Sequence, residues 1–115
     1  MPTGDGPKYA GRTVILINEL TQSEAEATAL LFEAANGTRF VGSPSAGANG
    51  DITSTCLPGD VCVSFSGHEV RHADGRPLQR VGLKPDVEVR PTLAGLRAGR
   101  DEVLDRAIRY LDETR

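Results

Sequence analysis

Apolar residues occur along the chain with two different periods, which predict both strands and helices. Residues 13–17, TVILI, form a continuous run rich in β-branched side chains, as in a strand covered on both faces within a parallel sheet. Residues 25–35 instead repeat apolar side chains at helical spacing, and Asn36-Gly37 is a typical helix stop. The predicted apolar stripe consists of Ala27, Leu30, Leu31 and Ala34.

Shorter runs downstream of this helix predict further strands and a last helix. The expected strands are residues 39–41, a hairpin of residues 52–57 and 61–65, and residues 87–89. Asp101 is a good N-cap for a C-terminal helix. Its apolar stripe consists of Leu104, Ala107, Ile108 and Leu111. The Gly and Pro content and the low apolar fraction of 38% indicate a turn-rich α/β or β-rich chain rather than a helical bundle.

Composition limits the size of the protein and the kinds of partner it suits. The chain has 115 residues, which is one domain or a piece of a larger one, and 13 Gly with 7 Pro indicate many turns. A net charge of -3, with acidic and basic residues interspersed, gives no basic patch for nucleic acid or for an anionic membrane. We therefore expect no nucleic-acid partner.

The first residues carry no targeting pattern. Residues 1–12, MPTGDGPKYAGR, read as a linker or arm, lack the apolar region of a signal peptide, and leave residues 13–115 as the domain. No apolar run approaches the ~18–20 residues of a membrane span. As written, the sequence predicts a cytoplasmic protein, and a periplasmic or secreted location stays open for a longer parent.

The two cysteines flank the turn of the predicted hairpin. Cys56 and Cys62 would lie opposite one another, but Cβ atoms of opposed strand residues are ~4.5–5.5 Å apart, whereas a disulfide prefers ~3.8 Å. Two free thiols are therefore favoured, and a cross-strand disulfide in an oxidising compartment stays open.

Ser23 stands where the first strand leads into the first helix, and two interpretations compete for it. With Glu26 it matches a capping box, in which each side chain bonds the backbone amide of the other residue. A hydroxyl at a helix N-terminus also lies beside free amides that stabilise an oxyanion, so Ser23 could be a nucleophile. Spacing alone favours the cap, and a nucleophile would need a general base from elsewhere.

A second motif, His68-Glu69-Val70-Arg71-His72, matches the zinc-peptidase pattern HExxH. That pattern needs a helix, because only there do the two imidazoles share one face. The flanking residues Gly67 and Asp74-Gly75 leave no room for such a helix. We expect no metal site here.

Residues 42–50 form a loop of small residues between two predicted strands. The loop has no Gly-Lys-Ser/Thr and no GxGxxG, so it is not a phosphate loop. A tight structural turn and a loop that lines a substrate site are equally good interpretations.

Several segments, taken in order, resemble the carboxy-terminal processing (tail-specific) serine peptidases, a family that includes tricorn-like and retinoid-binding-protein-like relatives. The matching segments are VILINELTQSEAEATAL, ANGTRFVGSPSAGANG, ADGRPLQRVGLKPDVEV and AGRDEVLDRAIRYL. The resemblance implies the C-terminal part of a crotonase- or protease-subunit-like α/β fold of stacked ββα units. It also implies a peptide or protein substrate and no cofactor.

The same resemblance assigns roles to individual residues. Ser23 aligns with the nucleophile, and the Glu24 backbone amide aligns with one oxyanion donor. Separately from the resemblance, Gly42, Gly47 and Ala48 are the residues of the small-residue loop that would line a substrate if the loop has that role.

Two positions depart from the family pattern. Ala48 stands where one branch has a lysine base, and Gln79 stands where the other branch has a glutamate.

These departures leave three hypotheses about function. In the first, the chain is a serine peptidase fragment that takes a histidine base from an upstream half or from a partner chain. In the second, it is a catalytically silent fold remnant or peptide-binding module. The third and most distant is a zinc peptidase using His68, Glu69 and His72. We expect the isolated chain to be inactive and either to associate, as a homo-oligomer, or to be marginally stable.

Overall fold

The structure is a computed structural model that describes residue 6 and residues 9–114. Its elements are β1 (Val14–Ile17), α1 (Glu24–Asn36), β2 (Arg39–Gly42), β3 (Ile52–Leu57), β4 (Val61–Ser66), β5 (Val87–Glu88), α2 (Leu93–Arg97) and α3 (Glu102–Glu113). Each predicted strand and helix forms close to its expected bounds, and α2 is an additional short helix. Most of the predicted arm, residues 1–12, lies outside the described residues. Within the described part, no helix is long and apolar enough to cross a membrane.

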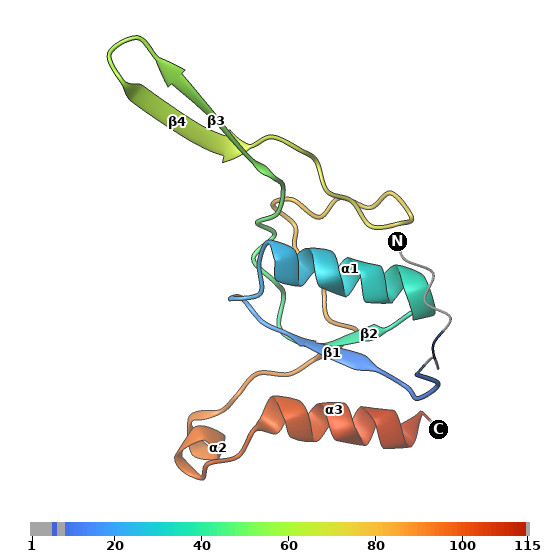
Figure 1. The fold of residues 1–115 in the computed structure, drawn as a ribbon. Helices are drawn as coiled ribbons and strands as arrows, with labels where there is room; N and C mark the ends of the chain where they lie inside the picture. The colour runs from blue at the N-terminus through green and yellow to red at the C-terminus, as the bar shows by residue number, and fades with distance from the viewer. Residues whose placement is uncertain (1–5, 7–8, 115) are drawn as a thin grey trace.

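The centre of the molecule is a parallel sheet with helices on both faces. Strands β1, β2 and β5 lie in that order, with β1 and β5 both parallel to β2. Figure 1 shows α1 on one face of the sheet and α3 on the other. The expected parallel pairing is therefore confirmed for β1, but its cover is incomplete because Leu16 remains 41% exposed.

The main core lies between the sheet and α1. It is formed by buried residues from β1, α1, β2 and the long connection between β4 and β5: Ile17, Ala29, Leu30, Phe40, Leu78 and Leu83. Leu78 and Leu83 are both fully buried although they lie in no helix or strand. The 67–86 connection thus supplies part of the core, and the burial of these two leucines holds it against α1 and the sheet.

The predicted apolar face of α1 is wrong by part of a turn. The helix buries Glu26, Ala29 and Leu30, whereas Leu31 is 50% exposed. Helical spacing favoured Leu31 because it is apolar. A charged residue occupies the core row instead, since the Glu26 carboxyl group finds hydrogen-bond donors in the loop after β2.

The apolar stripe of α3 is only partly correct. Ala107 is buried, but Leu104 and Ile108 are 45% and 51% exposed. The less exposed side chains of α3 lie on a neighbouring row that includes Val103, Ala107 and Tyr110, so Leu104 and Ile108 lie at the surface. Its start is as predicted, because the Asp101 side chain accepts a hydrogen bond from the Leu104 amide at 2.9 Å.

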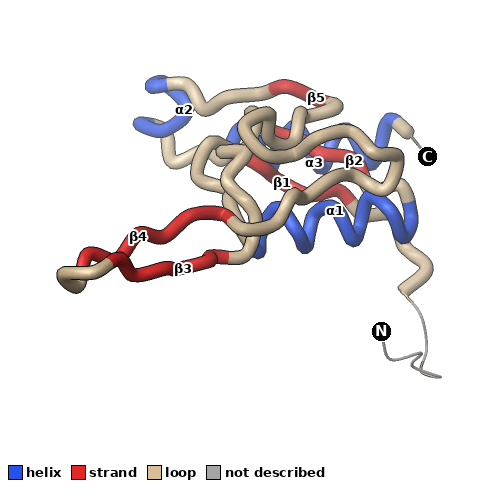
Figure 2. Tube along the Cα trace, turned by 90° about the horizontal axis from the view of Figure 1, so that it is seen from above, coloured by secondary structure: helices blue, strands red, loops and turns tan. Residues whose placement is uncertain are grey.

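Strands β3 and β4 form the predicted antiparallel hairpin, which extends away from the body of the molecule (Figures 1 and 2). All residues of both strands are exposed. Cys56 and Cys62 are directly paired and form a disulfide, with their Cα atoms 4.0 Å apart. The favoured prediction of two free thiols is therefore wrong, because the direct pairing of the two strands brings these cysteines close enough to bond.

Candidate active site

Ser23 lies in a tight turn that connects β1 to α1. The Ala25 amide donates a hydrogen bond to the Gln22 carbonyl at 3.1 Å, which closes a four-residue β-turn. Ser23 has φ 54° and ψ -122°, the values of the first central residue of a type II′ turn. That position normally holds glycine, and such backbone strain costs about 1–3 kcal/mol in a non-glycine residue. An exposed serine is thus held in a strained conformation at the start of a helix.

The capping-box interpretation of Ser23 is wrong. An N-cap residue normally has β-region backbone angles, and the positive φ of Ser23 does not fit that requirement. The Ser23 side chain makes no capping hydrogen bond, and the Glu26 side chain points to a different part of the chain. Helix α1 therefore begins without the side-chain cap that the spacing predicted.

The loop after β2 holds the Ser23 backbone from both sides. The Ser23 amide donates to the Ala48 carbonyl at 2.8 Å, and the Asn49 side-chain amide donates to the Ser23 carbonyl at 2.8 Å. Two residues earlier on each segment, the Ala46 amide donates to the Thr21 carbonyl at 2.9 Å. The predicted small-residue loop therefore runs alongside the serine turn and fixes its conformation.

The Glu24 amide, at the first position of α1, has no hydrogen-bond acceptor among the described residues. It follows Ser23 directly and lies at the positive end of the helix dipole. A free amide in this position can donate to an oxygen that carries developing negative charge.

The three loop residues expected to line the substrate lie in different surroundings. Gly42 and Gly47 are buried, with φ of 134° and 65°. A Cβ atom at Gly42 would lie 2.0 Å from the Ile17 carbonyl oxygen, so β1 approaches too closely for any side chain. Ala48 is exposed and contributes the carbonyl that binds Ser23. The structure thus gives the two glycines a packing role.

Gln79 is half-buried at the base of the hairpin. Its side-chain amide nitrogen donates to the carbonyls of Asn49 at 2.8 Å and His68 at 2.5 Å, and its oxygen accepts from the Val70 amide at 3.2 Å. Asn49 connects the two residues, because its carbonyl accepts from Gln79 and its side chain donates to the Ser23 carbonyl. The resemblance therefore pointed to a residue close to the serine turn, although its observed bonds tie backbone segments together.

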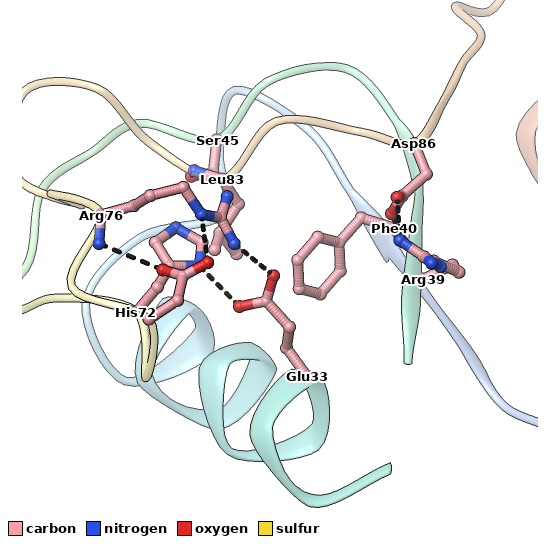
Figure 3. A network of polar contacts seen from close by, with 9 residues as sticks. Glu33, Arg39, Phe40, Ser45, His72, Arg76, Leu83 and Asp86 are labelled. Atoms are coloured by element: carbon pink, nitrogen blue, oxygen red, sulfur yellow. Dashed lines mark hydrogen bonds and ion pairs between the residues drawn. The ribbon is translucent and has the colours of Figure 1, made fainter. Parts of the chain in front are cut away.

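The two histidines of the HExxH motif have different surroundings. His68 is exposed, with its Nδ1 atom 3.3 Å from Asp51. His72 is buried, with its Nδ1 atom 2.5 Å from Glu33 of α1. Figure 3 shows Arg76 on the same Glu33 carboxyl group, 3.0 Å away. The segment is not helical, so it lacks the geometry that the motif requires for zinc.

A cleft of about 880 Å³ lies beside the serine turn, between the end of β1 and the α2–α3 region. Thr21 and Glu19 are in its wall, whereas Ser23 is not among the lining residues. A backbone hydrogen bond and one from the Ser43 hydroxyl, at 3.0 Å, lower the pKa of Glu19. The cleft therefore carries a negatively charged side chain at neutral pH.

Sequence reasoning gave no role to Ser45 and Asn49, and it gave Glu26 a different role, as the partner of Ser23 in a capping box. Glu26, Ser45 and Asn49 all contact the loop or the turn around Ser23. Glu26 lies in register with the buried Ala29 and Leu30, which was the one signal available. It was hidden because a charged residue is rarely assigned to a core position.

Fold and site together define the class: part of an α/β domain with an exposed serine at the strained turn between the first strand and its helix. A family model described as Peptidase family S41 matches residues 2–89. The chain therefore belongs to peptidase family S41, and the family expected from the sequence is confirmed.

Solved structures show the same fold at low sequence identity. A Parabacteroides merdae protein assigned as a peptidase superposes with a TM-score of 0.84 at 23% identity, over 94% of this chain and 34% of that one. The tricorn protease gives 0.69 at 24% identity, over 90% and 10%. The photosystem II D1 C-terminal processing protease gives 0.60 at 23% identity, over 73% and 22%.

The chain thus spans about a third of the length of the Parabacteroides merdae protein and less of the other two. The fold expectation is confirmed as part of the α/β domain of this family. No curated protein matches the chain by sequence.

Proposed function

We propose that this chain is the C-terminal part of a serine peptidase catalytic domain, with Ser23 as its nucleophile. The observation that carries the proposal is the strained backbone of Ser23, whose amide donates to the Ala48 carbonyl and whose carbonyl accepts from the Asn49 side chain. Strain of this kind persists only where the surroundings impose it, and it concentrates at functional sites. In nucleophile elbows the same arrangement exposes a serine oxygen between a strand and a helix.

The reaction follows from the atoms around this turn. The Ser23 Oγ attacks the scissile carbonyl of a peptide or protein substrate and gives its proton to a general base. The Glu24 amide donates to the oxyanion of the tetrahedral intermediate. The protonated base then passes its proton to the leaving amine, and water hydrolyses the acyl-enzyme. In this proposal Ala48 borders the substrate, and Gln79 holds the place of the carboxyl group of the family's other branch.

The general base comes from outside the described residues. No described side chain forms a hydrogen bond with the Ser23 hydroxyl. A histidine from an upstream half, or from a partner chain, would complete the pair. We therefore expect the 115-residue chain alone to lack peptidase activity.

The test is covalent labelling by a fluorophosphonate of the chain joined to the upstream half of its reading frame. We expect modification of Ser23, identified by peptide mass spectrometry, and its loss in Ser23→Ala. Ser64→Ala is the matched control, because Ser64 is an exposed serine on the hairpin and its loss should leave labelling unchanged.

The rival hypotheses predict different outcomes. A joined protein that binds peptide but is never labelled would support the silent module. This is the second candidate because no described group activates the hydroxyl. Labelling that survives Ser23→Ala would place the nucleophile elsewhere. Turnover abolished by a chelator would support the zinc hypothesis and contradict the proposal.

A further inference from the structure

Glu26 of α1 is an acidic residue that is buried with only one of its two carboxyl oxygens hydrogen-bonded within the described residues. Its side chain is fully buried, in the helical row that also carries Ala29 and Leu30. Acidic residues are almost never buried to this extent unless other groups hydrogen-bond to them. One oxygen, Oε1, accepts from the Ser45 hydroxyl at 2.5 Å and from the Gly47 amide at 2.7 Å. The other, Oε2, has no hydrogen-bond partner among the described residues.

These contacts connect Glu26 to the serine turn through the loop. Gly47, bound by Glu26, precedes Ala48, whose carbonyl accepts from the Ser23 amide. The helix also connects Ser23 to Glu26 directly, because Ser23 is the N-cap residue of α1 and Glu26 lies in its first turn. The start of α1, the Glu26 carboxyl group and the 45–48 loop thus form a closed hydrogen-bond network that includes Ser23, the proposed nucleophile.

The same hydrogen-bond network also extends into the core. The Ser45 hydroxyl donates to Glu26 and accepts from the Leu83 amide at 2.7 Å. Figure 3 shows Ser45 next to Leu83, where the connection from β4 to β5 passes the loop. Gly47 packs against the same connection, since a Cβ atom there would lie 2.7 Å from the Gly82 amide. The loop is therefore held between Glu26 on one side and the 80–83 segment on the other.

We infer that Glu26 is a positioning residue for Ser23: its carboxyl group fixes the 45–48 loop, and the loop holds Ser23 in its strained conformation. This inference rests on the proposed role of Ser23 as nucleophile. An ordinary structural carboxyl group would stabilise the fold as a whole. Glu26 is different because both hydrogen bonds of its carboxyl group are made with the 45–48 loop, which binds Ser23.

The first measurement is amide hydrogen exchange of the Ser23 and Gly47 amides, which needs no catalysis. In Glu26→Ala we expect both amides to exchange at least ten times faster, because Gly47 loses its acceptor and the loop is released. Glu26→Gln keeps a side-chain oxygen that can accept both bonds, so exchange should remain close to wild type. Glu33→Gln is the matched control, because Glu33 is a hydrogen-bonded carboxyl group at the other end of α1.

The second measurement is the rate of fluorophosphonate labelling at Ser23 in the chain joined to its upstream half. We expect at least a tenfold loss in Glu26→Ala, recovery in Glu26→Gln and no change in Glu33→Gln. Labelling that is absent from every form, the unsubstituted one included, would refute the nucleophile while the exchange measurement still tests Glu26.

Two results would overturn the inference. One is a Glu26→Ala protein that keeps wild-type exchange at the Ser23 amide. The other is a Glu33→Gln protein that accelerates this exchange as strongly, since the effect would then be global. If Glu26→Ala does not fold, Ser45→Ala serves in its place, because it removes one of the two donors to the same oxygen. Ser45→Ala should accelerate exchange at Ser23, and an unchanged rate would refute the inference.

Discussion

At the scale of single residues, Ser23 combines two costs that a structural residue would avoid. It adopts a positive φ without being glycine, and its hydroxyl caps no helix amide. Asn49 and Ala48 hold it there by hydrogen bonds to its backbone alone. The side chain is thereby left free and exposed, which suits a nucleophile better than a cap.

This strain predicts the stability of two Ser23 variants. Ser23→Gly should raise the free energy of unfolding by about 1 kcal/mol, because relief of strain exceeds the added entropy of the unfolded glycine. Ser23→Ala keeps the Cβ atom and should change stability by less than about 0.5 kcal/mol. Urea denaturation of both variants measures the difference. Equal stabilities for the two would show that the turn is unstrained.

At the scale of elements, one carboxyl group connects α2 to α3. Glu102, in the first turn of α3, accepts hydrogen bonds from the Thr92 amide at 2.5 Å and the Thr92 hydroxyl at 3.1 Å. Thr92 is also the N-cap of α2. The backbone bond, then the hydroxyl bond, and to a smaller extent the Arg100 charge lower the pKa of Glu102.

The lowered pKa predicts how acid affects this junction. A carboxyl group with a lower pKa in the folded state stabilises the protein above its unfolded pKa, for which 4.5 is the ordinary value. That stabilisation is lost as the pH falls through the lowered folded pKa. Glu102→Gln should therefore weaken the protein at pH 7 and flatten its stability profile below 4.5. Urea denaturation from pH 7 to pH 3 tests this, and parallel profiles for the two proteins would contradict it.

At the scale of the whole molecule, both helices that cover the sheet expose apolar side chains. Leu31 and Phe32 of α1 are 50% and 44% exposed, and Leu104 and Ile108 of α3 are 45% and 51% exposed. The chain also corresponds to only 34% of the Parabacteroides merdae protein. In such a protein, other segments can cover surfaces that are open here.

We therefore predict that the 115-residue chain self-associates through these surfaces. Ile108→Lys should shift the chain toward monomer in sedimentation velocity, because a charge replaces exposed apolar surface. Asp105→Asn changes the net charge equally on the same helix and should leave association unchanged. A monodisperse monomer of the unsubstituted chain at high concentration would refute the prediction.

The sequence by itself determined the elements and much of their arrangement. The run at 13–17 predicted a strand of a parallel sheet because both of its faces are apolar, and the structure pairs β1 parallel to β2. The left-handed Gly37 ends α1, and Asp101 caps α3, as the local chemistry predicted. Local backbone preferences and the period of apolar residues act over a few residues, so they can be read directly.

Only the tertiary structure decided the site. The face of α1 turned inward at Glu26 because donors from Ser45 and Gly47, some twenty residues away, satisfy its carboxyl group. Ser23 lost its expected cap because Ala48 and Asn49 impose a conformation that a cap does not adopt. Hydrogen bonds between distant segments override local preference in both cases, and burial strengthens those of Glu26. The serine could be identified from the sequence, but the hydrogen-bond network that holds it in place could not.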